Sequence, residues 1–285
     1  MNHLAAFWLY VRRAPQLAIG LWMLLFLVLF GLVGPLLIDT EMARPLAAVP
    51  RLAPSAQHPF GTDDAGRDLL AVMVVGVPLT LRIGFVAGSV GLSIGAILGL
   101  LAGFVGGRTD GFIRGIVDTL LTVPGLLVLI SVASSIREEI SVEIMALVVA
   151  SLSWMWPTRT IRAQVLSLRE RAFVQMARLN GQGTLEIIVR EVLPNLLPYL
   201  AASFALAVSS AILATISLEA LGLGPQNEPT VGMTIYWAIT FSALLRGMWW
   251  WWAIPIAFLI LLFVGLLLVA AGLDNLANPK SRRAT

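Results

Sequence analysis

Long apolar runs alternate with short polar segments along the whole of this 285-residue chain. An apolar run of about 18 residues or more is long enough to cross a bilayer as a helix. The pattern predicts six such spans, at 17–38, 77–104, 113–135, 142–158, 199–222 and 252–272. The fourth span is short, because Pro157 is expected to end it. The sequence therefore predicts an all-α, polytopic membrane protein.

The arginines and lysines indicate how these spans are oriented. If the N-terminus is cytoplasmic, most of the 19 fall inside, in segments 1–16, 105–112, 159–198 and 273–285. Segment 39–76 then lies outside. The positive-inside rule supports this orientation. The first apolar run is too long for the h-region of a signal peptide, so we interpret it as an uncleaved span.

The longest polar stretch with a helical pattern is VQMARLNGQGTLEIIVREVLPNLLP, at 174–198. Its first half places Ala172, Met176 and Leu179 on one helical face. Asn180-Gly181 is expected to end that helix, because glycine adopts the left-handed cap conformation without strain.

A second short helix is expected to follow this glycine. Thr184 is predicted to cap it, Glu186 falls in its first turn, and Pro194 is predicted to end it. The two helices would form a compact unit, which either lies on the bilayer surface or docks a cytoplasmic partner.

The second span carries a stripe of glycines, from Gly84 and Gly88 to Gly99 and Gly103. Small residues about four apart let helices approach closely. We expect this stripe to pack inside the subunit rather than at a seam between subunits.

Few charges fall within the spans. Arg114 and Asp118 are four residues apart. We expect them to form a structural pair, with a site on the transport path as the alternative, because a charge in the bilayer core costs about 2.5–3.5 kcal/mol or more. Glu219, near the outer end of the fifth span, faces either a water-filled path or the membrane interface. The MWWWWA run at 248–253 is typical of an interfacial aromatic belt.

Composition narrows the function classes. The chain is 58% hydrophobic and 12% charged, has no cysteine, and has only His3 and His58 as histidines. The pattern contains no metal-binding motif, no Walker A loop and no basic nucleic-acid patch. A channel or secondary transporter remains an alternative, but no internal repeat is visible. A membrane-embedded enzyme would need a cluster of catalytic groups, and none is apparent.

Several segments resemble, in the same order, the inner-membrane permease subunits of binding-protein-dependent ABC importers. The resemblance is closest to permeases of the dipeptide, oligopeptide and nickel group. HPFGTDDAGRDLL (58–70) is similar to that group's GTDxxGRD signature, here Gly61, Thr62, Asp63, Gly66, Arg67 and Asp68. Segments 102–130, which contains Arg114 and Asp118, 218–235 and 272–283 are similar to further family segments.

Segment 159–198 resembles the EAA loop of these importers, which the family uses as a coupling helix in a groove of the ATPase. The resemblance assigns this docking role to Ala172, Gln175, Met176, Ala177, Gly181, Glu186, Leu193 and Pro194. Two residues depart from the family pattern. Gln175 replaces the usual glutamate, and Thr215 stands where family members often have a glutamate. We hypothesise that this second acid has moved to Glu219, one turn later on the same face.

The resemblance implies a MetI-like fold, with one N-terminal helix added to a five-helix core at 77–272. It also implies a homologous second permease, two ABC ATPases and a solute-binding protein, in a bacterial inner membrane with both termini cytoplasmic. The chain would be non-catalytic and bind no cofactor, since ATP and Mg²⁺ would bind the ATPases. Di- or oligopeptides are the expected cargo. Nickel or other metal chelates, oligosaccharides and peptide-like antibiotics are the alternatives.

Overall fold

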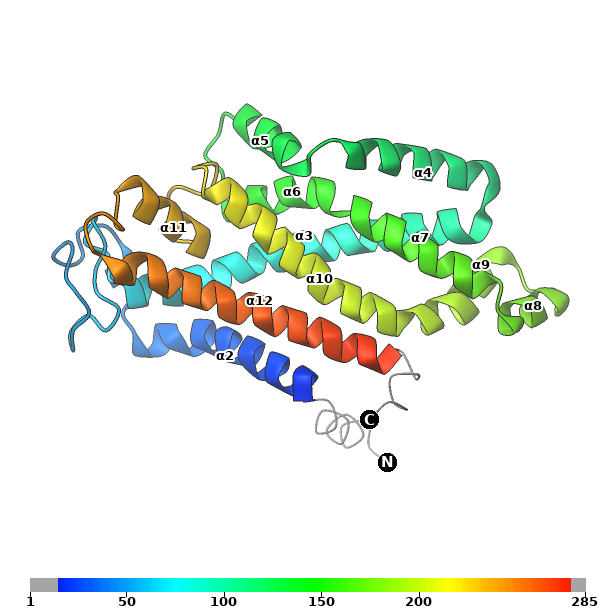
Figure 1. Ribbon diagram of the computed structural model, residues 1–285, viewed down its shortest axis with the longest axis horizontal. Helices are drawn as coiled ribbons and strands as arrows, with labels where there is room; N and C mark the ends of the chain where they lie inside the picture. Colours follow the sequence, from blue (N-terminus) through cyan, green and yellow to red (C-terminus); the bar gives the residue numbers. More distant parts are fainter. Residues whose placement is uncertain (1–14, 278–285) are drawn as a thin grey trace.

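The computed structural model describes residues 15–277, which form an elongated bundle of helices without a β-strand in that range (Figure 1). The helices are α2 Pro15–Leu37, α3 Leu69–Val105, α4 Gly107–Thr122, α5 Gly125–Ser135, α6 Val142–Ser153, α7 Met155–Arg169, α8 Ala172–Leu179, α9 Thr184–Ile187, α10 Leu193–Glu219, α11 Val231–Thr240 and α12 Trp249–Ala277. The all-α class is confirmed. The predictions for 1–14 and 278–285 lie outside the described residues.

Four helices are long and apolar enough to span a membrane, namely α2, α3, α12 and a continuous helix from Thr184 to Glu219 that includes α9 and α10. The predicted third span is a broken helix, since α4 and α5 are bent by 83° from each other. The break has a local cause. Pro124 disfavours helical backbone at the residue before it, and Val123 is accordingly extended (φ −84°, ψ 130°).

The predicted end of the fourth span at Pro157 is wrong. Two helices cover this region, the short apolar α6 and then α7, which runs on to Arg169. Pro157 lies in the first turn of α7. In that turn a missing N–H removes no intrahelical hydrogen bond, so the proline starts a helix here instead of ending one.

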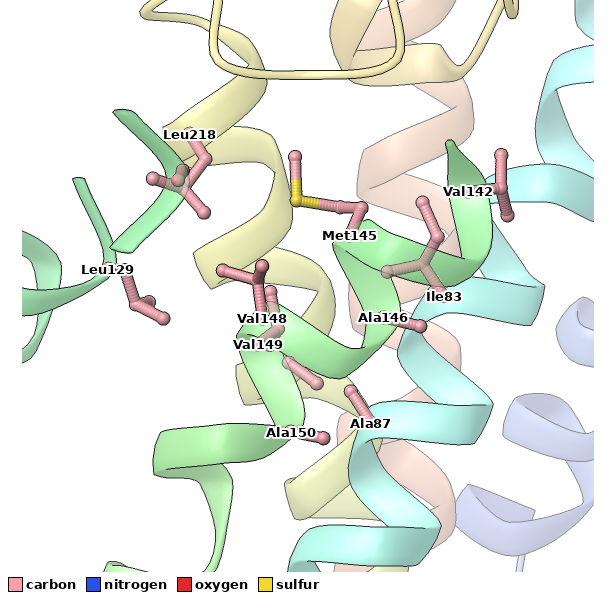
Figure 2. Packing of buried hydrophobic residues seen from close by; sticks show 12 residues of the cluster. Ile83, Ala87, Leu129, Val142, Met145, Ala146, Val148, Val149, Ala150 and Leu218 are labelled. Carbon is pink, nitrogen blue, oxygen red and sulfur yellow. The ribbon is translucent and has the colours of Figure 1, made fainter. Parts of the chain in front are cut away.

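The glycine stripe of α3 packs inside the subunit, which confirms the prediction. A Cβ added at Gly88 would lie 2.9 Å from the backbone of Val208 in α10, and one at Gly95 would lie 2.6 Å from Cβ of Pro157 in α7. These contacts are too close for a side chain, so glycine sets the distance between the helices. Beside the stripe, apolar residues of α3, α5, α6 and α10 form a core that includes Ile83, Met145 and Leu218 (Figure 2).

A substitution pair tests this packing. Gly91→Ala places a Cβ 2.5 Å from that of Ser153, whereas Gly115→Ala in α4 meets nothing within 4 Å. We expect Gly91→Ala to lower the unfolding free energy by about 1–3 kcal/mol, because overpacking forces the backbones apart. Gly115→Ala should be neutral or stabilise by up to about 1 kcal/mol. Thermal unfolding of the purified chain in detergent measures both, and equal shifts would contradict the packing argument.

The end of the bundle that the charge pattern predicts to lie outside contains a helix that the sequence pattern did not predict. Helix α11 has only 10 residues, too few to span a membrane, and it lies beside the start of α12 (Figure 1). The tryptophan run opens α12 at this level. Trp249 is exposed, but Trp250 and Trp251 are buried, and Trp250 Nε1 donates to the carbonyl of Thr62 (3.1 Å). The aromatic-belt interpretation is therefore wrong for these two residues, which pack the outer loop onto the bundle.

Candidate functional site

Residues 172–194, to which the family resemblance assigns a coupling role and which we call the coupling segment, begin with α8 at one end of the bundle (Figure 1). Helix α8 ends at Gly181, as predicted. Gly181 has φ +77° and donates to the carbonyl of Arg178 (3.0 Å), and Gln182 donates to that of Ala177 (3.2 Å). This pair of bonds is the Schellman motif, which satisfies the last carbonyls of a helix. Backbone geometry therefore requires a glycine at 181.

The second half of the coupling segment differs from the prediction. Gly183, not Thr184, is the N-cap residue of α9, and no side chain caps it. Pro194 does not end the helix, because a π-helical turn at Ile188–Val192 joins α9 directly to α10. The wider turn accommodates the proline ring, which in a regular helix clashes with the carbonyl four residues earlier. The coupling segment is thus α8 followed by the first turns of one long helix.

The coupling segment has a buried inner face and an exposed outer face. Val174, Ala177, Ile187, Ile188 and Val192 are buried, in a cluster with Phe104 of α3 and Ile161 of α7. On the outer face, four apolar side chains are exposed: Met176 (59%), Leu179 (81%), Leu185 (72%) and Val189 (52%). We call these four the apolar patch. Apolar side chains gathered at one exposed end of a protein mark an interaction surface.

Polar groups surround the apolar patch. Arg190 pairs with Glu186 (2.5 Å), Arg178 lies over the ring of Phe104 (5.5 Å to the centroid), and Gln175 is exposed. Of the remaining predicted docking residues, Ala172 and Pro194 are exposed, Leu193 is half-buried and Ala177 is buried. The structure therefore brings the predicted residues together at one end, with Ala177 supporting the surface from within.

At the opposite end, residues 61–68 form a tightly bonded loop. The carboxylate of Asp63 is 1% exposed, pairs with Arg67 (2.6 Å), and accepts from the backbone N–H groups of Ala65 and Arg67 (both 2.9 Å). The Arg67 guanidinium stacks 3.7 Å from the ring centroid of Trp237 in α11. Asp68 caps α3 and bonds His58 (2.7 Å). Gly61 and Gly66 have φ of +73° and +75°. The GTDxxGRD-like motif is therefore a structural clasp, which we call the outer clasp after the side on which the sequence analysis places it.

Arg114 and Asp118 pair on α4 (3.2 Å) and are partly exposed, as the spacing predicted. The sequence analysis missed a neighbouring pair that joins two helices: Asp110 of α4 accepts two hydrogen bonds from Arg162 of α7. These two residues are 52 positions apart, so no local pattern could have revealed the pair.

Glu219 faces neither a path nor the membrane interface. Its side chain is fully buried (0% exposed) and accepts a hydrogen bond from Thr230 Oγ1 (2.7 Å). Thr215, one turn earlier, is also fully buried, and its hydroxyl donates to the carbonyl of Ala211 in its own helix. Both side chains thus lie on one buried face of α10.

A groove of about 940 Å³ opens between α7, α10 and the α4–α5 break. Its walls are mostly apolar, with hydroxyl groups from Ser153, Thr160, Tyr199, Ser203, Ser209 and Ser210. No aspartate, glutamate, arginine, lysine or histidine is among the described residues that line it. Arg114, Asp118 and Glu219, which the sequence suggested for a possible path, do not line this groove.

No cluster of three or more metal-ligating side chains occurs within residues 15–277. The notable surfaces of the described chain are therefore the apolar patch, the uncharged groove and the outer clasp.

Comparison with known proteins agrees with this geometry. Residues 95–283 match the family described as "Binding-protein-dependent transport system inner membrane component". The chain is 32% identical over 276 residues to a dipeptide transport system permease protein of Bacillus subtilis, covering 97% of this chain and 85% of the relative. It is 34% identical to an oligopeptide transport system permease protein of Mycobacterium tuberculosis (80% and 78%), and 30% identical to a putative peptide transport system permease protein of Brucella suis (95% and 90%).

Proposed function

Because the chain belongs to the family of binding-protein-dependent transport system inner membrane components, we propose that it is one of two permease subunits in an ATP-driven importer of di- or oligopeptides. The similar proteins of Bacillus subtilis, Mycobacterium tuberculosis and Brucella suis carry the names of dipeptide, oligopeptide and peptide permeases, which supports peptides as cargo. The chain makes and breaks no bond in the cargo. ATP and Mg²⁺ bind to two partner ATPases.

The observation that carries the proposal is the apolar patch. Met176 and Leu179 of α8, with Leu185 and Val189 of the next helix, are exposed, while the inner face of both helices is buried. This is the geometry of a helix-in-groove contact, in which an amphipathic helix places apolar anchors in a partner's groove. We propose that the partner whose groove receives these anchors is the ATPase. Closure of the two ATPases on ATP then moves the coupling segment, and the spans follow.

We further propose that α6 and α7 together make a sixth span, which brings the total to six with the α4–α5 pair counted as one. The excess of arginine in segment 159–198 supports a cytoplasmic coupling segment. The N-terminus and the tail then face the cytoplasm, and the outer clasp faces the solute-binding protein. The membrane is the bacterial inner membrane.

The uncharged groove is assigned as this subunit's half of the translocation path. A peptide carries a polar backbone and side chains of every kind. The hydroxyl groups of the groove can form hydrogen bonds with that backbone. Because the described walls carry no charged side chain, they do not favour peptides with one kind of side chain over another. A homologous second permease closes the other half. A Cβ added at Gly107, Gly111 or Gly115 of α4 would meet no atom of this chain within 4 Å. These glycines therefore offer the second permease a face for close helix packing.

Uptake measurements test the cargo. Cells with and without this gene are given a labelled dipeptide or pentapeptide at low concentration, and separately labelled nickel. We expect deletion to remove peptide uptake, and the gene supplied in trans to restore it, with nickel uptake unchanged. Loss of nickel uptake alone would replace peptide with metal as the cargo.

Purification of the tagged chain tests the machinery. We expect two ATPase subunits and a second permease to copurify in mild detergent. If the chain purifies alone and still moves solute in proteoliposomes without ATP, it is a channel or a secondary transporter.

A further inference from the structure

One uninterrupted helix connects the coupling segment with the outer end of the bundle. It runs from Thr184 to Glu219 over 36 residues, or about 54 Å at the usual rise per residue. Its first turns carry Leu185 and Val189 of the apolar patch, and its last residue is Glu219. A continuous helix, here with a π-helical turn at Ile188–Val192, can carry a displacement from one of its ends to the other.

The last residue of this helix is bonded to the start of α11. Glu219 Oε1 accepts from Thr230 Oγ1 (2.7 Å), and the same hydroxyl oxygen accepts from the N–H of Met233 (3.1 Å). Thr230 is thus the N-cap of α11 and the partner of Glu219 at once. The carboxylate lies at the positive end of the α11 dipole, where a negative or hydrogen-bond-accepting group is stabilised.

The backbone around Glu219 is shaped to admit its side chain. A Cβ at Gly232 would lie 1.9 Å from Glu219 Oε2, and a Cβ at Gly224 would lie 2.7 Å from Glu219 Cγ. The two glycines therefore leave a slot that this side chain fills. The neighbouring N–H of Val231 donates to Thr80 Oγ1 of α3 (3.0 Å), so the start of α11 is held from two sides.

The other side of α11 contacts the outer clasp. The guanidinium of Arg67 lies 3.7 Å from the ring centroid of Trp237 in α11. Arg67 also pairs with the buried Asp63. Helix α11 therefore lies between the end of α10 and loop 61–68.

We propose that Glu219 is a positioning residue that fastens α11 to α10, so that movement of the coupling segment reaches the outer clasp, and the reverse. We call the Glu219–Thr230 contact the outer latch. This inference rests on the proposed importer function. In this proposal the latch couples docking of the solute-binding protein outside to ATP hydrolysis by the ATPases inside. Such coupling is reciprocal, because binding at each site must change the binding affinity of the other site by the same factor.

The test uses the complete importer, with both permeases, both ATPases and the solute-binding protein, in lipid nanodiscs. ATP hydrolysis is measured with and without peptide-loaded binding protein. We expect Glu219→Ala and Thr230→Val to reduce the stimulation by about fivefold or more, the lower range of allosteric coupling. Basal hydrolysis should stay within about twofold of the unaltered complex, because the coupling segment itself is untouched.

The chain offers matched controls. Thr215→Val removes an equally buried hydroxyl that bonds only within α10. This variant should retain stimulation. Thr230→Ser keeps the hydroxyl and should retain it too, whereas the double variant Glu219→Ala/Thr230→Val should be no worse than either single one. Normal stimulation in Glu219→Ala, or an equal loss in Thr215→Val, would overturn the latch.

A spectroscopic measurement tests the latch without cargo. The chain has no cysteine, so Leu221→Cys and Ile239→Cys, both at exposed positions, can carry a spin-label pair across the α10–α11 junction. We expect a narrow distance distribution, which Glu219→Ala broadens and Thr215→Val does not. An unchanged distance distribution in Glu219→Ala would contradict the proposal that Glu219 fastens α11 to α10. Absence of binding-protein-dependent hydrolysis in the unaltered complex overturns the proposed function instead.

Discussion

Replacing Gly181 with proline is expected to abolish peptide uptake while the protein remains in the membrane. Gly181 has φ +77°, which proline cannot adopt, and its N–H, which proline lacks, bonds the carbonyl of Arg178. The cost of about 3 kcal/mol or more falls on the junction between α8 and α9. We therefore expect α8 to lose its position, Met176 and Leu179 to leave the apolar patch, and ATPase docking to fail.

Uptake of labelled peptide, ATPase copurification and the amount of protein in the membrane measure this result. The control is Gly183→Pro, two residues later. There φ is −74°, which suits proline, and the N–H donates no hydrogen bond within residues 15–277. It should retain most uptake. Normal uptake in Gly181→Pro would show that transport does not need the Schellman turn, and would remove the coupling segment from the mechanism.

The second large effect is expected from Asp63→Ala in the outer clasp. The change leaves the Arg67 guanidinium, 7% exposed, without its carboxylate, and it deprives the N–H groups of Ala65 and Arg67 of their acceptor. Removing one partner of a buried ion pair costs about 3–5 kcal/mol. For a protein of this size we expect the unfolding temperature to fall on the order of 10 °C, measured on the purified chain in detergent.

The neighbouring aspartate provides the comparison for this variant. Asp64 pairs with Arg51 (2.5 Å) and Arg246 (2.7 Å), but both arginines are about half exposed. Solvent-exposed ion pairs contribute about 0–1 kcal/mol, so Asp64→Ala should shift the unfolding temperature only slightly. If the two variants unfold at the same temperature, Asp63 does not hold the clasp.

Local backbone chemistry explains which predictions succeeded. The glycine stripe of α3, the helix end at Gly181 and the Arg114–Asp118 pair each depend on residues a few positions apart, and the structure contains all three. The bend between α4 and α5 was also within reach of the sequence. Pro124 marks it, but the apolar run around it concealed the break.

The failures share a different cause. Pro157 and Pro194 were expected to end helices, yet a first-turn position and a π-helical turn accommodate them. Trp250 and Trp251 were assigned to the membrane interface, yet they are buried against the outer loop. In each case the rule considered one residue type by itself, and its surroundings decided the outcome: neighbouring backbone geometry for the two prolines, and contact with the distant loop at Thr62 for the tryptophans.

The sequence by itself determined that this chain is a polytopic helical membrane protein with a polar coupling segment, because hydrophobicity and charge act on each segment separately in a bilayer. Its motif order also indicated the family. Only the tertiary structure decided what Glu219 contacts, which side chains form the apolar patch, and that one helix joins the patch to the outer latch. Those facts depend on contacts between residues far apart in sequence, such as Thr80 with Val231 and Asp110 with Arg162, and no local pattern records them.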